Sequence, residues 1–310
     1  MSFSGEVKEE LAKQLSRSRH CQLAELAAMI HFAGRISAEK GGTVLKISAD
    51  HASIARKCYT LIKKAFSCNA RINTAVNYGV VVEREEDVLR ILQAVKLVDV
   101  NGVPRGSAEL VDGLLVQKSC CRRAYIRGAF LASGSMSDPQ KSYHFEIVCS
   151  AMAQAAQLCE IMREFVPDAK VVQRKKYYIV YIKEGAQIVD VLNVMEAHTS
   201  LMNLENVRIV KEMRNSVNRQ VNCETANINK TVNAAVRQVE DIRLIQEKRG
   251  LSSLSENLRE IAELRLDYPD APLKELGEYL NPPVGKSGVN HRLRKLSEIA
   301  KELKEEEEQV

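Results

Sequence analysis

The spacing of apolar residues changes period several times over the first hundred positions, which predicts helices alternating with strands. Residues Ser4 to Leu15 have helical spacing, and Ser4 offers an oxygen for the N-cap. From Gln22 to Phe32 the apolar residues are too dense for a surface helix, so we expect a buried helix that Gly34 closes. A strand, a helix, a β-rich stretch and a further helix are predicted over Thr43 to Ala49, Ala52 to Phe66, Ala75 to Glu83 and Glu86 to Val98.

The same order of elements begins again after a stretch rich in glycine and proline, Asn101 to Ser107. Leu26 to Gly34 corresponds to Ile126 to Gly134 at an offset of 100 positions, and this offset also matches Cys21 with Cys121. Two copies of one half-domain that face each other across a pseudo-two-fold axis explain such a repeat. The second copy should contain helices and strands over Arg122 to Ala132, Tyr143 to Cys149, Ala151 to Phe165, Ala169 to Arg174, Tyr177 to Ile182, Ala186 to Met195 and Leu201 to Met213.

The last hundred residues read as helical throughout. A polar, asparagine-rich segment from Arg214 to Ile245 leads to several short apolar helices. We therefore expect an α+β fold, in which a duplicated αββαββα unit precedes an all-α domain. The expected parts are a first half at 1–104, a second half at 105–213, a helical linker at 214–253, a helix-turn-helix domain at 254–304 and an acidic tail at 305–310.

The amino-acid composition restricts the possible binding partners and metal sites only a little. The net charge of +5 over 310 residues is compatible with nucleic acid as partner but is a weak hint by itself. The chain has eight cysteines and no Cys-x-x-Cys pair, so neither a zinc ribbon nor an iron–sulfur site is expected, and free buried thiols are favoured. The charged N-terminus and the lack of a run of 18 apolar residues predict a cytoplasmic protein without a membrane span.

The paired stretches at Leu26 and Ile126 resemble the motif helices of the LAGLIDADG homing endonucleases, over roughly the first 210 residues. The resemblance implies two helices packed at a domain interface, a basic saddle of antiparallel sheets, and an acid before each final glycine that holds a divalent metal. Here those positions are Ala33 and Ser133, which offer no charged ligand. The expectation is a fold that has lost cleavage, with no catalytic residue, no metal and no cofactor.

Neighbouring residues keep alternatives open. His31 occupies the position of the motif's other acid, although a histidine on a packed helix is more often a satisfied interface residue than a ligand. Glu39 and Asp138 lie shortly after the two motifs and are candidate replacement carboxylates for an active endonuclease. Cations for secondary DNA contacts are Arg174, Lys175 and Lys176 in a hairpin, together with Lys118, Arg122, Arg123, Arg127, Arg208, Lys211 and Arg214. A solvated surface turn is an equal alternative for the hairpin.

The C-terminal unit has the pattern of a helix-turn-helix. Leu273 to Leu280 carries an apolar stripe, Gly277 permits a tight corner, Pro282 and Pro283 stop the helix, and Ser287 is a possible cap for the next helix. In that last helix an apolar face turns inward and leaves groove-reading residue types outside. The candidate DNA-binding residues are Lys286, Ser287, Asn290, His291, Arg292, Arg294 and Lys295. The alternative is an ordinary basic surface helix.

The degenerate double motif, the linker from Asn227 to Ala235 and the C-terminal sequence from Asn281 to Leu296 resemble the WhiA family over essentially the whole chain. The resemblance implies a non-enzymatic, sequence-specific regulator of transcription, concerned with sporulation, cell division and chromosome segregation. Its implied partners are double-stranded promoter DNA and another transcription factor or RNA polymerase, at the nucleoid. Two other functions stay open, a metal-dependent DNA endonuclease and an adaptor of the division machinery for which DNA binding is secondary.

Overall fold

The computed structural model describes residues 2–39, 42–74, 78–103 and 110–308. By their internal contacts the residues separate into two compact units, Met1–Glu212 and Met213–Val310. Parts of two expected features, the β-rich stretch from Ala75 and the boundary at Asn101 to Ser107, lie outside the described residues.

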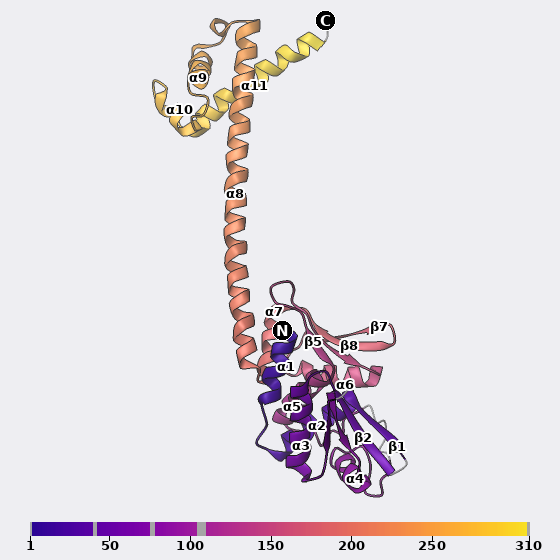
Figure 1. Ribbon diagram of the computed structural model, residues 1–310. Helices are drawn as coiled ribbons and strands as arrows, with labels where there is room; N and C mark the ends of the chain where they lie inside the picture. Colours follow the sequence, from indigo (N-terminus) through magenta and orange to yellow (C-terminus); the bar gives the residue numbers. More distant parts are fainter. Residues whose placement is uncertain (1, 40–41, 75–77, 104–109, 309–310) are drawn as a thin grey trace. The chain divides into compact units, whose positions relative to one another are not determined.

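The first unit contains two copies of the predicted series of elements (Figure 1). A leading helix α1 (Phe3–Lys13) precedes them. The first copy consists of α2 (Arg19–Ala33), β1 (Gly34–Glu39), β2 (Gly42–Ala49), α3 (Ala52–Phe66), β3 (Arg71–Asn73), β4 (Tyr78–Val82) and α4 (Glu85–Ala94). The second copy consists of α5 (Ser119–Ser133), β5 (Gly134–Met136), β6 (Phe145–Cys149), α6 (Met152–Arg163), β7 (Lys170–Arg174), β8 (Tyr177–Ile182) and α7 (Gly185–Met195). The duplicated αββαββα order is confirmed.

Each copy folds its four strands into one antiparallel sheet. The strand orders are β1-β2-β4-β3 and β5-β6-β8-β7, so the two sheets have the same topology. Their registers also correspond, because Gly34 pairs with Ile47 and Gly134 pairs with Ile147. The repeat therefore extends from the motif helices to the hydrogen-bond register of the sheets.

The helices α2 and α5 form the contact between the two copies. Their apolar residues are buried on nearly all sides, and Leu26, Ala28, Ile126 and Ala129 have no exposed surface. Gly128 allows the close approach, because a Cβ atom there would lie 2.4 Å from the carbonyl oxygen of Glu25 and 2.9 Å from the Cβ of Ala28. The dense apolar runs that mark these helices in the sequence are the interface of the two halves.

Two local expectations for the first unit are wrong. The N-cap of α1 is Ser2, whose side chain accepts a hydrogen bond from the backbone of Gly5, whereas the Ser4 hydroxyl accepts one from the backbone of Met136. Ser4 therefore joins the two halves instead of capping its own helix. Helix α4 ends at Ala94 and does not reach Val98, because Lys96 adopts a left-handed conformation with φ of 63°.

The helix expected over Leu201 to Met213 and the helical linker expected after it form one continuous helix, and the two compact units divide between Glu212 and Met213. One helix, α8 (His198–Lys248), runs without interruption for 51 residues from the first unit into the second. The apolar spacing that predicts a separate helix from Leu201 ends near Met213, but the polar, asparagine-rich sequence after it continues as helix. The change of pattern at Met213 thus marks the boundary between the two units within one helix.

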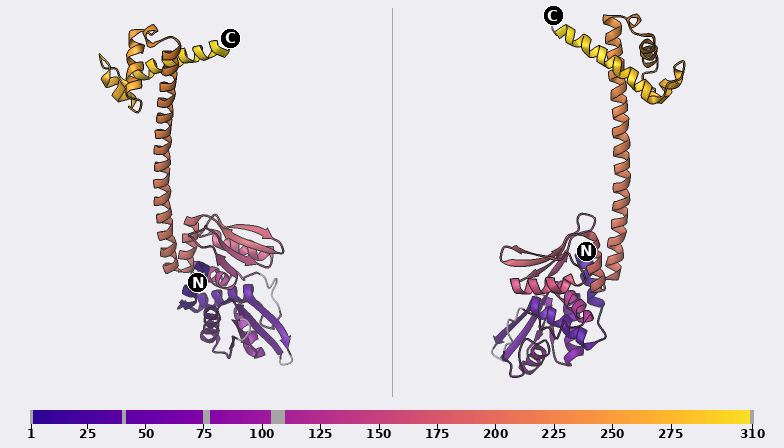
Figure 2. Two further views of the ribbon diagram at one scale, coloured as in Figure 1. Left: turned by 45° about the horizontal axis from the view of Figure 1, so that its top comes forward. Right: turned by 180° about the vertical axis from the view of Figure 1, so that it is seen from behind.

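In the second unit, α9, α10 and the start of α11 gather around the C-terminal part of α8, as both views of Figure 2 show. The helices are α9 (Glu256–Asp267), α10 (Leu273–Tyr279) and α11 (Lys286–Glu308), with a short 3-10 turn η1 (Leu251–Ser253) before them. Their core contains Ile242 and Ile245 from α8, and the rest of it consists of Ile261, Ala262, Leu276, Leu280, Val289, Leu293, Leu296, Ala300 and Leu303.

The corner between α10 and α11 depends on Gly277. The backbone N–H of Val284 donates to the carbonyl of Gly277 at 2.9 Å, and a Cβ on Gly277 would lie 2.0 Å from the carbonyl oxygen of Val284. Ser287 is already the second residue of α11, so the expectation that it caps this helix is wrong. The residues expected to form an acidic tail from Glu305 onward instead continue α11 as far as Glu308.

Candidate nucleic-acid interface

The exposed face of α11 is the strongest candidate for contact with DNA. Val289, Leu293 and Leu296 are almost completely buried against the second-unit core. With a step of about 100° per residue, the opposite side of the helix consists of the other positions of its first three turns. The exposed candidates on α11 are Lys286, Ser287, Asn290, His291, Arg294 and Lys295.

Arg292 differs from the other candidates because it lies against α9. Its Nη1 atom is 3.8 Å from the Glu260 carboxylate and 3.4 Å from the carbonyl oxygen of Asn257, and its side chain is only 20% exposed. These contacts fix α11 on α9. The residue therefore helps to orient the exposed face, and its guanidinium is already engaged.

A cavity of about 620 Å³ adjoins the first turn of α11 in the second unit. Lys230 from α8, Lys274 from α10 and Lys286 from α11 all line it, and so does Asn290. Lysines from three helices thus line one hollow, together with Arg265 and the acidic Asp270. The basic character of the α11 face continues onto α8, a contribution that the sequence pattern did not reveal.

The hairpin cations form a separate basic site in the first unit. Arg174 and Tyr177 pair across the β7–β8 ladder, which leaves Lys175 and Lys176 as a two-residue turn. Lys175 has a positive φ of 57°, and the Lys176 ammonium lies 5.3 Å from the centre of the Tyr177 ring. Arg174, Lys175 and Lys176 are all exposed, so they are accessible to a phosphate backbone as well as to solvent.

The C-terminal ends of α2 and α5 carry the two degenerate motif positions. A hollow of about 640 Å³ opens beside Ala33, and among the described residues that line it Asp50 is the carboxylate. Asp50 lies 3.0 Å from the Lys8 ammonium. On the other helix the Ser133 hydroxyl donates to the carbonyl of Val148 at 2.9 Å. Ala33 lines this hollow and Ser133 does not, and neither motif position carries a charged side chain.

The two replacement carboxylates and His31 have other surroundings. Asp138 holds a turn, because its Oδ1 accepts from the backbone of Gln140 at 2.9 Å. The side chain of Glu39 lies outside the described residues. His31 Nδ1 is 3.2 Å from the Tyr125 hydroxyl, its Nε2 is buried with no partner among the described residues, and burial lowers its pKa to about 4. His31 is thus a neutral interface residue, as its place on a packed helix predicts.

Arg127 does not lie at the DNA-facing surface, and this expectation is wrong. It belongs to an ion cluster in which Glu25, Lys57 and Arg127 are buried and Glu196 lies at the surface. Its Nε is 3.0 Å from Glu25 and its Nη1 is 2.8 Å from Glu196. Lys57 lies 2.5 Å from Glu25. Burial by itself raises the pKa of Glu25, but the charges of Lys57 and Arg127 outweigh it and hold that pKa below its ordinary value. The cluster joins the two halves.

Several other predicted cations are also engaged. Arg122 pairs with Glu164 at 2.6 Å, Arg208 pairs with Glu205 at 2.8 Å, and Lys211 donates to the carbonyl of Pro139 at 2.7 Å. Two further exposed cations, which the sequence pattern did not single out, lie opposite each other in the first sheet, Arg35 on β1 and Lys46 on β2. The alternation of Lys46 with the buried Leu45 and Ile47 was the available signal. No helix in the described part of the chain is both long and apolar enough to cross a bilayer.

Comparison with known proteins covers both units. Three family models match, namely the WhiA N-terminal LAGLIDADG-like domain over residues 19–98, the WhiA LAGLIDADG-like domain over 122–214 and the WhiA C-terminal HTH domain over 217–300. The "Probable cell division protein WhiA" of Lachnoclostridium phytofermentans is 53% identical, with 98% of this chain and 100% of the relative covered. The protein of the same name from Alkaliphilus oremlandii is 50% identical, with 98% of each chain covered.

Among solved structures, full-length DUF199/WhiA from Thermatoga maritima is similar with a TM-score of 0.58 and 25% identity. The alignment covers 97% of this chain and 99% of that one. The similarity therefore includes the duplicated α+β unit, the long connecting helix region and the helical C-terminal unit.

Proposed function

Because the chain belongs to the WhiA family, we propose that it is a sequence-specific DNA-binding regulator of transcription that serves cell division. The observation that carries this proposal is the exposed face of α11, where Asn290, His291 and Arg294 stand free of the core. Side chains of these types form hydrogen bonds with base edges in the major groove, and the second helix of a helix-turn-helix is the element that enters it.

The residues of this face divide into two roles. Asn290 suits bidentate pairing with adenine, and Arg294 suits pairing with guanine. Lys286, Ser287 and Lys295 lie at the margins, where contacts with phosphate set the register of the protein on the duplex without reading sequence. Arg292 supports the orientation of α11 through α9, and Lys230 and Lys274 extend the cationic surface.

We further propose that the first unit is a scaffold without nuclease activity. Hard divalent cations require oxygen ligands with negative charge, and Ala33 and Ser133 provide none at the motif positions. The nearby Asp50 is engaged by Lys8. Purified protein with Mg²⁺ should leave supercoiled DNA intact, and reproducible nicking that Asp138→Asn abolishes would overturn this part of the proposal.

In this proposal residues 1–104 and 105–213 are the two halves of the scaffold, 214–253 connect it to the DNA-reading domain at 254–304, and the hairpin Arg174 to Lys176 adds a secondary, nonspecific contact. The relatives carry the name of a cell division protein, which supports a role in cell division. In this proposal the targets are promoters of genes for division, chromosome segregation and sporulation. Another transcription factor or RNA polymerase would be the protein partner, and the place of action would be the nucleoid in the cytoplasm.

The decisive experiment measures binding of the full chain to a site that has first been selected from random duplexes. Arg294→Ala should cost about 1–3 kcal/mol and relax the preference at one base pair, because a bidentate contact with guanine is lost. Lys301→Ala is the matched control, since Lys301 is exposed further along α11 and pairs with Glu305 at 3.6 Å. Unchanged affinity and sequence preference in both Arg294→Ala and His291→Ala would refute the assignment of α11.

A further inference from the structure

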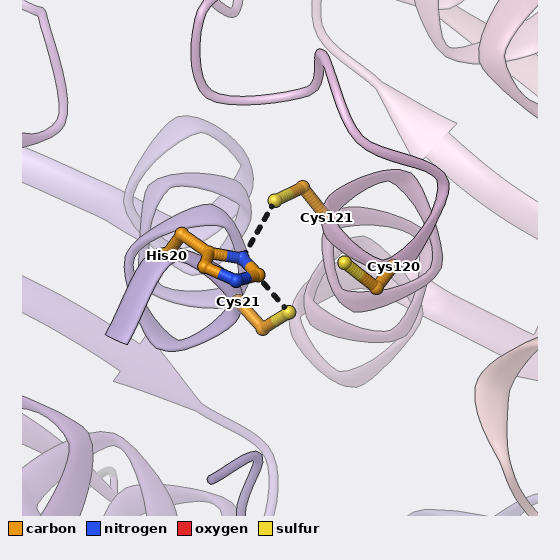
Figure 3. Close-up of side chains that lie close together, drawn as sticks. All are labelled: His20, Cys21, Cys120 and Cys121. Carbon is orange, nitrogen blue, oxygen red and sulfur yellow. Dashed lines mark hydrogen bonds between the residues drawn. The ribbon is translucent and has the colours of Figure 1, made fainter. Parts of the chain in front are cut away.

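The N-terminal ends of α2 and α5 bring four metal-ligating side chains together (Figure 3). They are His20 and Cys21 from the first half, and Cys120 and Cys121 from the second half. One ligand atom from each lies within 4.8 Å of all the others. His20 Nδ1 is 3.2 Å from the Cys121 sulfur and 3.3 Å from the Cys21 sulfur.

The cluster follows the internal repeat. His20 corresponds to Cys120 and Cys21 corresponds to Cys121 at the same offset of 100 positions that relates the two motif helices. Cys21 and Cys121 are buried, where they pack against Ala24 and Ala124. Each helix thus contributes two consecutive residues, one buried and one exposed, to a site that straddles the pseudo-two-fold axis.

The donor set is that of a tetrahedral site for a soft cation. Three thiolates and one imidazole are ligands that bind Zn²⁺ in closed structural sites. Zinc–ligand bonds of about 2.0–2.3 Å place neighbouring ligand atoms about 3.6–3.8 Å apart in a tetrahedron. The two observed nitrogen–sulfur distances are a little shorter than this edge, so small rotations of the side chains are enough to admit an ion.

The surroundings also suit a metal–thiolate centre. The ligands lie in the first turns of α2 and α5, where the positive ends of both helix dipoles favour sulfur in its anionic form. His20 and Cys120 are exposed and provide a path for entry. Binding of the metal replaces the S–H proton of each thiol and releases it to solvent.

This cluster is separate from the degenerate nuclease position. Ala33 lies 13 residues beyond His20 on the same helix, which is about 20 Å at a rise of 1.5 Å per residue. We infer that His20, Cys21, Cys120 and Cys121 form a structural Zn²⁺ site that ties the two halves of the first unit together. The ion has four protein ligands and no open position, so its role is to stabilise the interface and not to hydrolyse a substrate.

Titration of the reduced, metal-free full chain with Co²⁺ tests the inference. One equivalent should produce the visible bands of tetrahedral cobalt together with thiolate-to-cobalt charge transfer, and Zn²⁺ should displace them. In Cys21→Ser and Cys121→Ser the affinity for Co²⁺ should fall by roughly tenfold or more, since loss of a ligand costs at least as much as loss of an outer-shell partner. Cys223→Ser is the control, because Cys223 is exposed on α8.

A second measurement guards against variants that fail to fold. X-ray absorption at the zinc edge of the wild-type protein should give three sulfur ligands and one nitrogen ligand. A spectrum of oxygen ligands alone, or cobalt bands that persist unchanged in Cys121→Ser, would overturn the inference. The inference would also be overturned if the reduced chain bound no metal and mass spectrometry of the oxidised chain, lighter by two hydrogens, showed a disulfide between Cys21 and Cys121. None of these readouts involves DNA, so they are independent of the proposed function.

Discussion

Arg127 and Arg294 show how differently the two units use the same side chain. Arg127 lies on a motif helix of the first unit, is 2% exposed and binds Glu25, Glu196 and the Ser16 hydroxyl. Arg294 lies on α11 of the second unit and is exposed. Both residues appear in the sequence as cations on basic helices. The difference teaches that a cation on a basic helix is available for contact with DNA only where the helix packed against it contributes no carboxylate partner.

Replacing Arg127 should have the largest effect of the predicted changes, a loss of stability of the first unit. An unchanged stability would contradict the comparison of Arg127 with Arg294. Arg127→Ala leaves the buried Glu25 with only Lys57 as a partner, so the first unit should lose about 3–5 kcal/mol of its free energy of unfolding. Urea unfolding followed by far-UV circular dichroism measures this. Arg122→Ala is the control, since the partly exposed pair with Glu164 should contribute less than about 1 kcal/mol.

The DNA affinity of Arg127→Ala, measured where the variant is still folded, should match that of the wild type. If Arg127→Ala had unchanged stability and a lower affinity for DNA, Arg127 would contact the duplex and would not belong to the ion cluster.

The pH dependence of stability extends the comparison, because His31 is buried in the first unit and His291 is exposed in the second. His31 is neutral in the folded state with a pKa of about 4, below the ordinary value of 6.5, so the unfolded state binds more protons between these values. Stability should therefore be fully present above about pH 6.5 and fall by on the order of 3 kcal/mol as the pH decreases to about 4. His31→Asn should flatten this part of the profile. His291→Asn on the exposed face of α11 should leave it unchanged, and equal profiles for His31→Asn and wild type would contradict the assignment.

The smallest predicted effect is on DNA affinity and comes from Lys295, at the margin of the exposed face of α11. Lys295→Ala should weaken binding to all duplexes about equally and reduce the slope of log affinity against log salt by about 1, because one phosphate contact is lost. Affinities measured at several salt concentrations, on specific and random duplexes, give both quantities. A loss confined to one sequence would instead identify Lys295 as a base-reading residue and move the boundary between the two roles.

The order of helices and strands was accessible from sequence because it depends on local period. Ala52–Phe66 and Tyr177–Ile182 have the bounds that their apolar spacing predicts. By contrast, β1 was not located because Gly34–Glu39 follows α2 directly, without a turn of its own. The apolar period of α8 stops near Met213 because periodicity depends on which face is buried, and α8 becomes exposed there while its helix continues.

The sites divide in the same way. The exposed positions of α11 follow from helical geometry within one element, so sequence spacing was enough to identify them. Arg127 and Glu25 are 102 positions apart, and no local pattern announces their contact. The Cys and His cluster was missed because its ligand pairs lie on different helices, although the match of Cys21 with Cys121 in the repeat was a signal that the two thiols meet at the axis.

The ion cluster has a consequence for how the protein is made. Glu25 and Lys57 leave the ribosome well before Arg127 and Glu196 are synthesised, and the apolar side of α2 has no α5 to cover it during that interval. Glu25 and Lys57 can pair within the first half, but the contacts of Glu25 with Arg127 and of α2 with α5 can form only after the second half has emerged.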